Sequence, residues 1–439
     1  MMDTATAAGV VRGRLYGGNV RFARVTTDTR ALAPGDLFVA LKGEQFDGHD
    51  FVPAAFARGA VADPLAALGQ LARHWRAQFT LPVVVIAGSN GKTTVKEMVA
   101  SILRAEFGAD AVLATRGNLN NRIGLPLTVL GLRAHHRAAA IELGMNHPGE
   151  TAELAAIAQP TVAIVNNAQR EHQEFMHGTA AVAEEHAALI RALAAGGTAV
   201  LNADDAHIGV WRDAARTRGA AVVEFALDHP AAVGGRFVPA AVAGTLELST
   251  GAGGATVRLA APGRHNAANA LAATAAALAA GLPLAAVVRG LEAFRPVAGR
   301  LVPRTAGSGA LVIDDTYNAN PDSVRAAIAV LAGIPGSKGL VLGDMGEVGA
   351  QGPAFHEEIG EFARAQGIDR LLAVGALAAA TVAAFGAGAL HFMSVEALAQ
   401  HAAATIDRGT TVLVKGSRFM RMERVVAALA GEAPDGGPR

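Results

Sequence analysis

The sequence predicts an α/β fold divided into three domains, and three observations support this prediction. Its 439 residues are too many for one ordinary hydrophobic core. From about residue 81 onward, strand-like apolar runs alternate with helical segments, as in parallel sheets that helices cover on both faces. One of these runs breaks at residue 88 into a short glycine loop that leads into a helix. We therefore expect domains at 1–80, 81–300 and 301–439.

The composition excludes several classes of protein. Lys+Arg and Asp+Glu each number 38, so no net charge favours binding to nucleic acid or to an anionic membrane. The absence of cysteine excludes disulfides, thiolate nucleophiles and cysteine-ligated zinc. The first residues do not resemble a secretory signal, and a Gly-Leu-Pro turn divides the uncharged segment 270–288 into two expected helices. We expect a cytoplasmic enzyme without nucleic-acid or membrane partners, and take it to be a monomer.

The first domain, residues 1–80, is predicted to be a small α/β unit. A Pro-Gly turn at 34–35 runs into an apolar strand, and polar, glycine-containing residues follow as a loop. Several candidate binding residues lie on either side of this strand, namely Asp28, Thr29, Arg30, Lys42 and His49. They are either solvated loop residues or groups that bind a diphosphate-bearing ligand, and both interpretations are open.

The central domain begins with the apolar run 83–87, which leads into Gly88-Ser89-Asn90-Gly91-Lys92-Thr93-Thr94 at the start of a helix. The glycines let backbone N–H groups turn inward, Lys92 can reach the outer phosphates, and Thr93 can ligate Mg2+. The loop is shorter than usual, because Ile86 stands where the first glycine is expected. A chance match is the alternative, but the flanking strand and helix favour triphosphate binding by a P-loop ATPase-like domain with a mainly parallel sheet.

Two further strands of the central domain are predicted to end in possible metal ligands. Glu142 closes the strand-like run 138–142, and His172 follows the run 161–168. Because ligands bind at the carboxyl ends of parallel strands, we expect Glu142 to face the same nucleotide as Lys92. His172 is either a surface loop residue or, with a neighbouring carboxylate, a ligand of Mg2+ or of the substrate.

Two asparagine-containing segments are also candidates for binding. Asn121 lies in the stretch 115–126, where Asn side chains could instead only stabilise a turn by bonding to their own backbone. Asn266 opens an alanine-rich helix, where its role could be that of a helix cap alone.

The last domain, residues 301–439, is predicted to be a Rossmann-like, doubly wound sheet. Strand-like runs occur near 310–315, 339–344, 371–375 and 411–416, and helical segments separate them. Polar residues gather where these runs end or in the loops beyond them: Asp315, Tyr317, Asn318, Asn320, Lys415 and Arg418.

Several motifs that occur in one order along the chain resemble the Mur ligases, the ATP-dependent enzymes that build the peptide of bacterial peptidoglycan precursors. In the first two domains the similar segments are Asp28-Thr29-Arg30, 37–51, 87–94, 120–126, 142–145 and 263–266. In the last domain, the segments 314–323, 342–347 and 414–418 are similar to those of family members that add a dipeptide. The resemblance therefore covers all three domains.

This resemblance implies a reaction. Members of that branch join D-alanyl-D-alanine to UDP-N-acetylmuramoyl-tripeptide, whose third residue can be diaminopimelate or lysine. ATP phosphorylates the terminal carboxylate, and the amine then displaces phosphate from the acyl phosphate. By resemblance, Lys92 neutralises the triphosphate, while Lys415 and Arg418 meet the reacting carboxylate or phosphate.

The resemblance also implies binding roles. Mg2+ is expected on Thr93 and Glu142, and His172 is expected to help hold a second Mg2+. The nucleotide is expected on residues 88–94, Asn266, Arg300 and Asp315, and the dipeptide or nucleotide near Asn121, Tyr317, Asn318 and Asn320. The first-domain candidates are expected to hold the uridine diphosphate end. Because these groups come from separate domains, closure is expected to exclude water, and a ligand-free molecule can be open.

One position departs from the family pattern. Many Mur ligases carry a carbamylated lysine where this chain has His186, within Glu184-Glu185-His186. His186 is either a weak Mg2+ ligand or a histidine on a helix surface.

Two related activities remain as alternatives, the addition of a diamino acid and a folylpolyglutamate-type ligation. An Asp-Asn-Pro-Arg motif, expected for the first, is absent, and Asn318-Ala319-Asn320-Pro321 favours the dipeptide-adding type.

Overall fold

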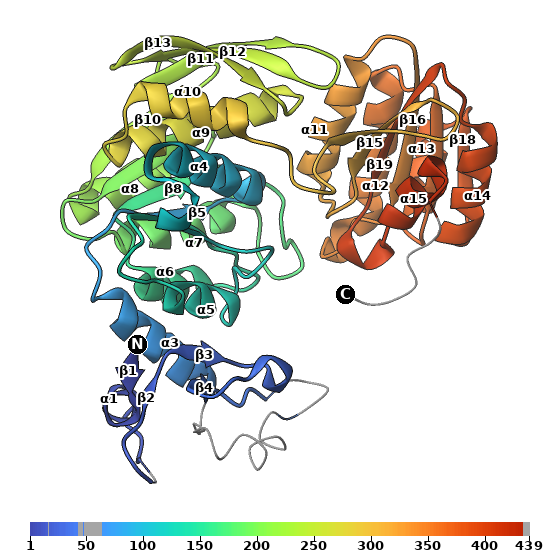
Figure 1. The fold of residues 1–439 in the computed structure, drawn as a ribbon. Coiled ribbons are helices and arrows are strands. Elements are labelled where there is room, and N and C mark those ends of the chain that lie inside the picture. Colours follow the sequence, from blue (N-terminus) through green and yellow to red (C-terminus); the bar gives the residue numbers. More distant parts are fainter. Residues whose placement is uncertain (16, 43–46, 48–63, 433–439) are drawn as a thin grey trace.

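The computed structural model describes residues 1–15, 17–42, 47 and 64–432, and shows three α/β regions in chain order (Figure 1). The predicted fold class is confirmed, since both large sheets consist mainly of parallel strands flanked by helices. The predicted ligand residue His49 lies outside the described residues.

The N-terminal region contains two small sheets. In one, β1 and β2 pair antiparallel, and in the other, β3 and β4 pair in parallel. Its described elements are β1 (Met2–Asp3), α1 (Thr4–Val10), β2 (Arg21–Phe22), β3 (Arg24–Thr26), the short helix η1 (Thr29–Ala31), β4 (Asp36–Phe38) and α3 (Pro64–Arg76). Leu68, Leu71 and Trp75 of α3 are buried in the core of the central region, and Trp75 Nε1 donates to Leu132 O at 3.0 Å. The predicted boundary near residue 80 therefore follows a helix that packs against the next domain.

A nine-stranded sheet forms the central region. Its spatial order is β13-β12-β11-β10-β9-β8-β5-β7-β6, and the seven strands from β11 to β6 in that order run parallel. The strands are β5 (Val83–Ala87), β6 (Val112–Ala114), β7 (Ala138–Glu142), β8 (Val162–Val165), β9 (Thr198–Asn202), β10 (Ala221–Ala226), β11 (Val233–Pro239), β12 (Gly244–Thr250) and β13 (Gly253–Leu259). β11, β12 and β13 form an antiparallel extension that the sequence patterns did not predict.

Helices cover both faces of this sheet. One face packs on α4 (Lys92–Phe107), α9 (Arg264–Ala279) and α10 (Leu284–Ala293). The other packs on α3, α5 (Gly124–Leu130), α6 (Glu150–Ala158), α7 (Thr179–Arg191) and α8 (Ile208–Arg218). The short helix η4 (Ala109–Ala111) precedes β6. The expected pair of helices within the uncharged segment is confirmed by α9 and α10.

The C-terminal region is a six-stranded doubly wound sheet. Its order is β14-β15-β19-β16-β17-β18, with β14 antiparallel at one edge. The strands are β14 (Val302–Thr305), β15 (Leu311–Asp315), β16 (Ser337–Gly343), β17 (Arg370–Val374), β18 (Ala389–Phe392) and β19 (Thr410–Lys415). On one face lie α11 (Pro321–Ala332), α12 (Gly352–Ala365) and α13 (Ala378–Phe385), and on the other α14 (Val395–Thr405) and α15 (Glu423–Ala430). Two short helices, η5 (Gly349–Gln351) and η6 (Arg418–Met420), lie at the edge that carries the strand ends.

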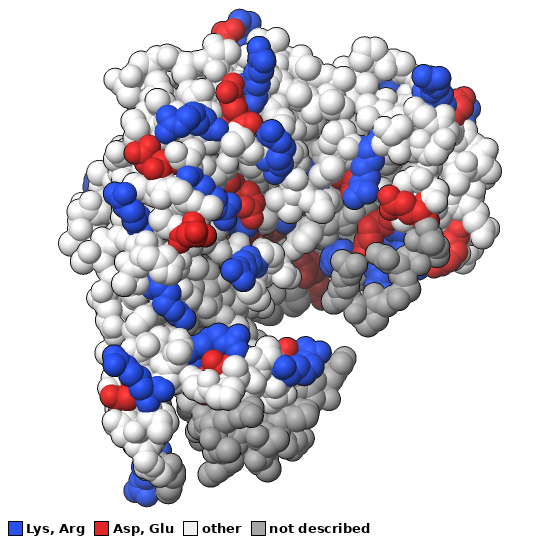
Figure 2. Space-filling model, viewed as in Figure 1, with Lys and Arg blue, Asp and Glu red and all other residues white. Residues whose placement is uncertain are grey.

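The outer surface carries both signs of charge. Basic and acidic side chains are interspersed over the face drawn in Figure 2, in agreement with the equal totals of the sequence. Within the described ranges, every helix is too short or too polar to cross a membrane.

A close helix contact fixes α4, the helix that begins at the glycine loop. A Cβ added to Gly290 on α10 would lie 2.3 Å from Ile102 Cα of α4, so only glycine allows the two backbones to approach this closely. Ser101 Oγ of α4 also donates to Gly290 O at 2.7 Å. The position of the loop therefore depends on Gly290, which lies in a helix far along the chain.

Replacing Gly290 by alanine should lower the free energy of unfolding of the central domain by about 1–3 kcal/mol, the usual cost of overpacking a core. Urea unfolding followed by Trp fluorescence measures it. Gly209, exposed on α8, is the matched control because a Cβ there meets nothing within 4 Å. Gly209→Ala should leave stability unchanged or raise it by up to about 1 kcal/mol. Equal effects of the two substitutions would contradict the packing argument.

Candidate functional site

The strand order brings the predicted ligands to one edge of the central sheet. β5 lies between β7 and β8, and all three run in the same direction. The glycine loop after β5 is therefore flanked by Glu142, which ends β7, and by the loop after β8 that carries His172. A cavity of about 1590 Å³ opens at this edge and extends to the C-terminal region.

Most of the predicted site residues line this one cavity. They are Ser89, Asn90, Gly91, Lys92, Thr93, Thr94, Asn121, Glu142, His172, Asn266, Arg300, Asp315, Tyr317, Asn318, Asn320 and Lys415. The predicted residues that do not line it are Gly88, Asp28, Thr29, Arg30, Lys42 and Arg418. The nucleotide candidates thus come together from two domains, whereas the first-domain candidates lie apart from them.

The glycine loop has the backbone conformation that anion binding requires. Gly88 and Gly91 have φ values of +140° and +84°, which side-chain-bearing residues rarely adopt. The space is also closed to a side chain, since a Cβ on Gly91 would lie 2.4 Å from Asn269 Oδ1. Lys92 Nζ donates to Gly88 O at 2.6 Å and Ser89 O at 3.1 Å, so its charge sits over the loop.

A chain of side-chain amides fastens the loop to the rest of the domain. Asn166 Nδ2 donates to Asn90 O at 2.8 Å and to Asn269 Oδ1 at 2.9 Å. Asn269 Nδ2 donates to Asn266 Oδ1 at 3.1 Å, and Asn266 Nδ2 donates to Pro262 O at 2.7 Å. The alternative that Asn266 caps its helix is wrong, because its amide joins this chain while Gly263 occupies the cap position.

Glu142 has the surroundings expected of a metal ligand. The residue is 2% exposed, and its Oε1 accepts from Asn120 Nδ2 at 2.7 Å. Its Oε2 is buried without a hydrogen-bond partner in the described part of the chain, which is costly unless a cation or donor binds there. No group of three acidic or histidine residues that could hold a metal alone occurs in the ranges that the structure describes. Mg2+ fits such a site, because it usually takes one or two carboxylates together with substrate phosphates.

Lys92 and His186 share a buried carboxylate. Glu171 Oε2 lies 3.0 Å from Lys92 Nζ, and Glu171 Oε1 lies 3.1 Å from His186 Nε2. Burial alone would raise the pKa of Glu171, but the charge of Lys92 and the hydrogen bond from His186 lower it to about 2. Because the carboxylate can only accept, His186 donates from Nε2. His186 is 2% exposed, so the interpretation as a helix-surface histidine is wrong.

His172 contacts the C-terminal region directly. Its φ of +47° is uncommon for a residue other than glycine, and its Nδ1 lies 2.7 Å from Glu347 Oε2. The adjacent His172 ring lowers the pKa of Glu347, which keeps that carboxylate ionised. In this structure His172 therefore joins the central domain to Glu347 of the C-terminal domain. Its role as a Mg2+ ligand remains a prediction.

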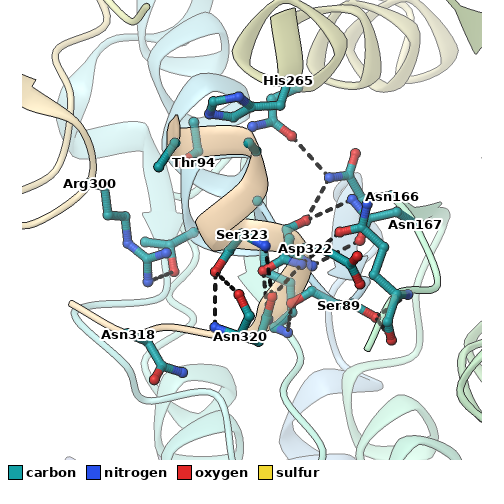
Figure 3. Close-up of a pocket in the computed structure, with 18 of the residues that line it drawn as sticks. Ser89, Thr94, Asn166, Asn167, His265, Arg300, Asn318, Asn320, Asp322 and Ser323 are labelled. Carbon is teal, nitrogen blue, oxygen red and sulfur yellow. Dashed lines mark hydrogen bonds between the residues drawn. The ribbon is translucent and has the colours of Figure 1, made fainter. Parts of the chain in front are cut away.

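Two further predicted residues bridge the domains (Figure 3). Arg300 Nη2 donates to Thr93 Oγ1 at 2.9 Å. The Arg300 guanidinium also stacks over the Tyr317 ring, with its carbon 4.0 Å from the ring centroid. Asn320 caps α11 and exchanges hydrogen bonds with the Asn90 amide at 2.9 and 3.3 Å. The start of α11 consequently lies against the glycine loop.

Lys415 is held inside the C-terminal region. Its side chain is 4% exposed, and Nζ donates to Asp315 Oδ2 at 2.6 Å and to Asn318 O at 2.9 Å. A buried charge of this kind needs a paired partner, which Asp315 supplies. Lys415 thus lines the same cavity as Lys92 but belongs to the other domain.

The remaining predicted residues have structural partners. Asp28 caps η1 and pairs with exposed Arg30 at 2.8 Å, and Lys42 lies 3.5 Å from Asp47. Arg418 is exposed and pairs with Glu423. Asn121 Oδ1 accepts from Gly124 N at 2.9 Å, as expected for the turn interpretation. Their ligand roles stay predictions.

The structure adds several residues that the sequence patterns did not select. Glu171 pairs with Lys92, while Asn166 and Asn269 support the loop. The signal for Glu171 was its place beside His172 after β8. Asn166 lies within the predicted run 161–168, directly after β8, but no pattern in the sequence connects it with Asn269, 103 positions away.

Comparisons with known proteins agree on one family. Residues 86–277 match the Mur ligase middle domain, residues 299–418 match the glutamate ligase domain of Mur ligases, and residues 21–102 match the catalytic domain of the Mur ligase family. UDP-N-acetylmuramoyl-tripeptide–D-alanyl-D-alanine ligase of Escherichia coli is 41% identical over 448 residues, covering 96% of each chain. The enzyme of the same name from Bacillus subtilis is 32% identical over 92% of each.

Solved structures show the same relationship. A crystal structure of MurF from Acinetobacter baumannii is 34% identical and covers 98% of this chain and 99% of its own, with a TM-score of 0.91. MurF ligase of Thermotoga maritima, solved with ADP, is 28% identical and covers 93% of this chain and 97% of its own, with a TM-score of 0.83.

Replacing Gly91 by alanine should weaken binding of MgATP at least tenfold, because the added Cβ both strains the backbone and strikes the supporting amides. Calorimetric titration measures the affinity. Gly219→Ala is the matched control, since Gly219 also has a positive φ of +70° but no atom within 4 Å of an added Cβ. If both variants bind MgATP as the parent does, the loop does not hold the nucleotide.

Replacing Glu142 by glutamine should weaken nucleotide-dependent binding of Mn2+, used in place of Mg2+, at least tenfold. The neutral amide can still accept from Asn120 but loses the charge that attracts the cation. Electron paramagnetic resonance of free Mn2+ in the presence of ADP measures it. Glu247→Gln, at an exposed site on β12, should bind Mn2+ as the parent does. Parental Mn2+ binding by the Glu142 variant would contradict the assignment.

Proposed function

The chain belongs to the Mur ligase family, and we propose that it is the ATP-dependent ligase that joins D-alanyl-D-alanine to UDP-N-acetylmuramoyl-tripeptide in peptidoglycan precursor synthesis. Relatives of that name cover nearly the whole chain, at up to 41% identity among those compared. Folylpolyglutamate synthase of Mycobacterium tuberculosis, at 20% identity, shares the fold alone. The dipeptide-adding reaction is therefore favoured over the other ligations.

One observation carries the proposal on the structural side. Lys92 from the central domain and Lys415 from the C-terminal domain line the same cavity, together with the partly unsatisfied carboxylate of Glu142. A carboxylate substrate and a triphosphate repel each other, so a site that joins them must supply positive charge to both. Two lysines from different domains meet that need.

The reaction proceeds in two displacements. An oxygen of the tripeptide carboxylate attacks the γ-phosphorus of ATP, forming an acyl phosphate and releasing ADP. The amine of D-alanyl-D-alanine then attacks the acyl carbon. The tetrahedral intermediate expels inorganic phosphate, and the nitrogen loses a proton to give the amide.

The chain's own residues position and neutralise the reactants. Lys92 moves from the loop carbonyls and Glu171 to the outer phosphates when nucleotide enters, and the loop N–H groups bind phosphate oxygens. The adenine end lies toward Asn266, and Arg300 reaches the phosphates from the linker. Lys415, fixed by Asp315, stabilises the carboxylate and then the departing phosphate, while Tyr317, Asn318 and Asn320 face the incoming dipeptide.

Glu142 and Thr93 would hold Mg2+, and His172 would help hold a second ion; when bound, the metal would neutralise charge on the phosphates. Glu142 fits this role, because its Oε2 is buried without a hydrogen-bond partner among the described residues, and Mg2+ usually takes one or two carboxylates together with substrate phosphates. Asp28, Thr29, Arg30 and Lys42 in the first domain bind the uridine diphosphate end. The enzyme works as a monomer in the cytoplasm, where ATP is supplied.

Phosphate release should require three substrates together. A coupled phosphate assay with UDP-N-acetylmuramoyl-tripeptide, MgATP and D-alanyl-D-alanine should give turnover, whereas omission of the dipeptide or replacement by single amino acids should lower the rate at least 100-fold. Tripeptides ending in diaminopimelate and in lysine are both offered. EDTA should abolish the activity, and Mg2+ should restore it. Phosphate release without the dipeptide at the full rate would instead indicate a nucleotide-driven switch.

A further inference from the structure

Arg170 joins the central domain to two helices of the C-terminal domain. It lies in the loop after β8, directly before Glu171. Its guanidinium donates to both oxygens of Asp322 at 2.7–3.2 Å, and to Glu358 Oε2 and Oε1 at 2.6 and 3.1 Å. Its backbone N–H also donates to Asp322 Oδ2 at 2.8 Å. One arginine therefore binds two carboxylates across the domain boundary.

One carboxylate belongs to α11, which lines the cavity, and the other to α12, which packs beside α11. Asp322 lies in the first turn of α11, two positions after Asn320, and Glu358 lies in the middle of α12. The guanidinium also stacks over the Phe355 ring of α12 at 5.2 Å. Arg170 thus fixes the separation and orientation of α11 and α12 relative to the loop after β8.

This cluster differs from an ordinary surface ion pair. The side chains of Arg170, Asp322 and Glu358 are only 23%, 22% and 34% exposed, and Arg325 adds a second cation to Glu358 at 3.0 Å. Exposed single pairs contribute little, whereas bidentate, partly desolvated networks are stronger and more specific in geometry. The hydrogen bond from Arg170 also lowers the pKa of Glu358, so the carboxylate remains charged at neutral pH.

The two residues after Arg170 connect it to the glycine loop and to the C-terminal domain. Glu171 binds Lys92 at 3.0 Å, and His172 Nδ1 lies 2.7 Å from Glu347. Glu174 N donates to Glu347 O at 3.2 Å, which adds a backbone contact between the same domains. Displacement of α11 and α12 would therefore pull on the segment that holds Lys92.

We propose that Arg170 is a positioning residue. It holds the C-terminal domain next to the glycine loop, so that Lys415 and Asn320 reach the reactants that Lys92 binds. Without the guanidinium, Asp322 and Glu358 face each other with Arg325 alone to compensate, and their repulsion favours separation of the domains. The catalytic part of this proposal rests on the proposed ligase function, whereas the placement of the domains does not.

The absence of cysteine makes the domain placement directly measurable. Ser249→Cys on β12 and Met393→Cys after β18 provide exposed sites for a pair of spin labels, one in each domain. Arg170→Met, which keeps an apolar stem, should broaden and lengthen the distance distribution between the labels without any substrate. Arg170→Lys keeps the charge but cannot donate to a carboxylate with two nitrogens at once, so its distribution of label distances should be intermediate. Asp322→Asn with Glu358→Gln tests the same contact from the other side if the Arg170 variants fold poorly.

Kinetics on the unlabelled protein then test the consequence. Arg170→Met should lower kcat at least tenfold while MgATP affinity, measured by calorimetry, changes less than about threefold, since the loop itself is intact. Arg212→Met is the matched control, because Arg212 makes a similar fork with Glu224 inside one domain, and it should retain parental kcat and distances.

The outcomes separate the two proposals. An unchanged distance between the labels in Arg170→Met overturns the positioning role, whatever happens to kcat. An equal loss of kcat in Arg170→Met and Arg212→Met overturns it as well. If the parent protein forms no amide bond, the ligase function fails, but the label distances still decide whether Arg170 places the domains.

Discussion

The order of three neighbouring strands determines where the charged groups of this site lie. Because β5 runs parallel between β7 and β8, the glycine loop, Glu142 and the Arg170–His172 segment all leave the sheet at one edge. No long side chain has to cross the sheet to reach the nucleotide. The C-terminal domain needs only to present its own strand ends, with Asp315 and Lys415, to that edge to complete the site.

Each lysine of the site is already paired in the absence of substrate. Lys92 binds Glu171 and Lys415 binds Asp315, so neither charge is left uncompensated in a partly buried place. In the proposed reaction, substrate anions exchange with these protein carboxylates instead of with water alone. Such a site keeps its cations oriented between turnovers, which reduces the reorganisation needed when phosphate arrives.

Sequence patterns predicted the residues whose positions are set locally. Lys92, Thr93 and Glu142 follow from strand, loop and helix signals within a few residues, and the doubly wound C-terminal sheet follows from alternating apolar runs. Contacts between distant segments could not be predicted in this way, because Asn90 with Asn320, or Arg170 with Asp322, meet only once the domains are placed. Asn266 was ambiguous for the same reason, since its partner Asn269 bonds to Asn166, which lies in the loop after β8.

The glycine contact between α4 and α10 affects the connection between the domains. α10 leads through residues 294–301 to β14, and Arg300 in that connection returns to Thr93 at the start of α4. Leu301 N also donates to Asp315 on β15 at 3.2 Å. The Gly290 contact thus fixes the helix from which this connection starts, and Arg300 and Leu301 hold its far end against both domains. Any rotation of the last domain must change torsions within residues 294–301, and one of these residues, Arg300, lines the nucleotide cavity.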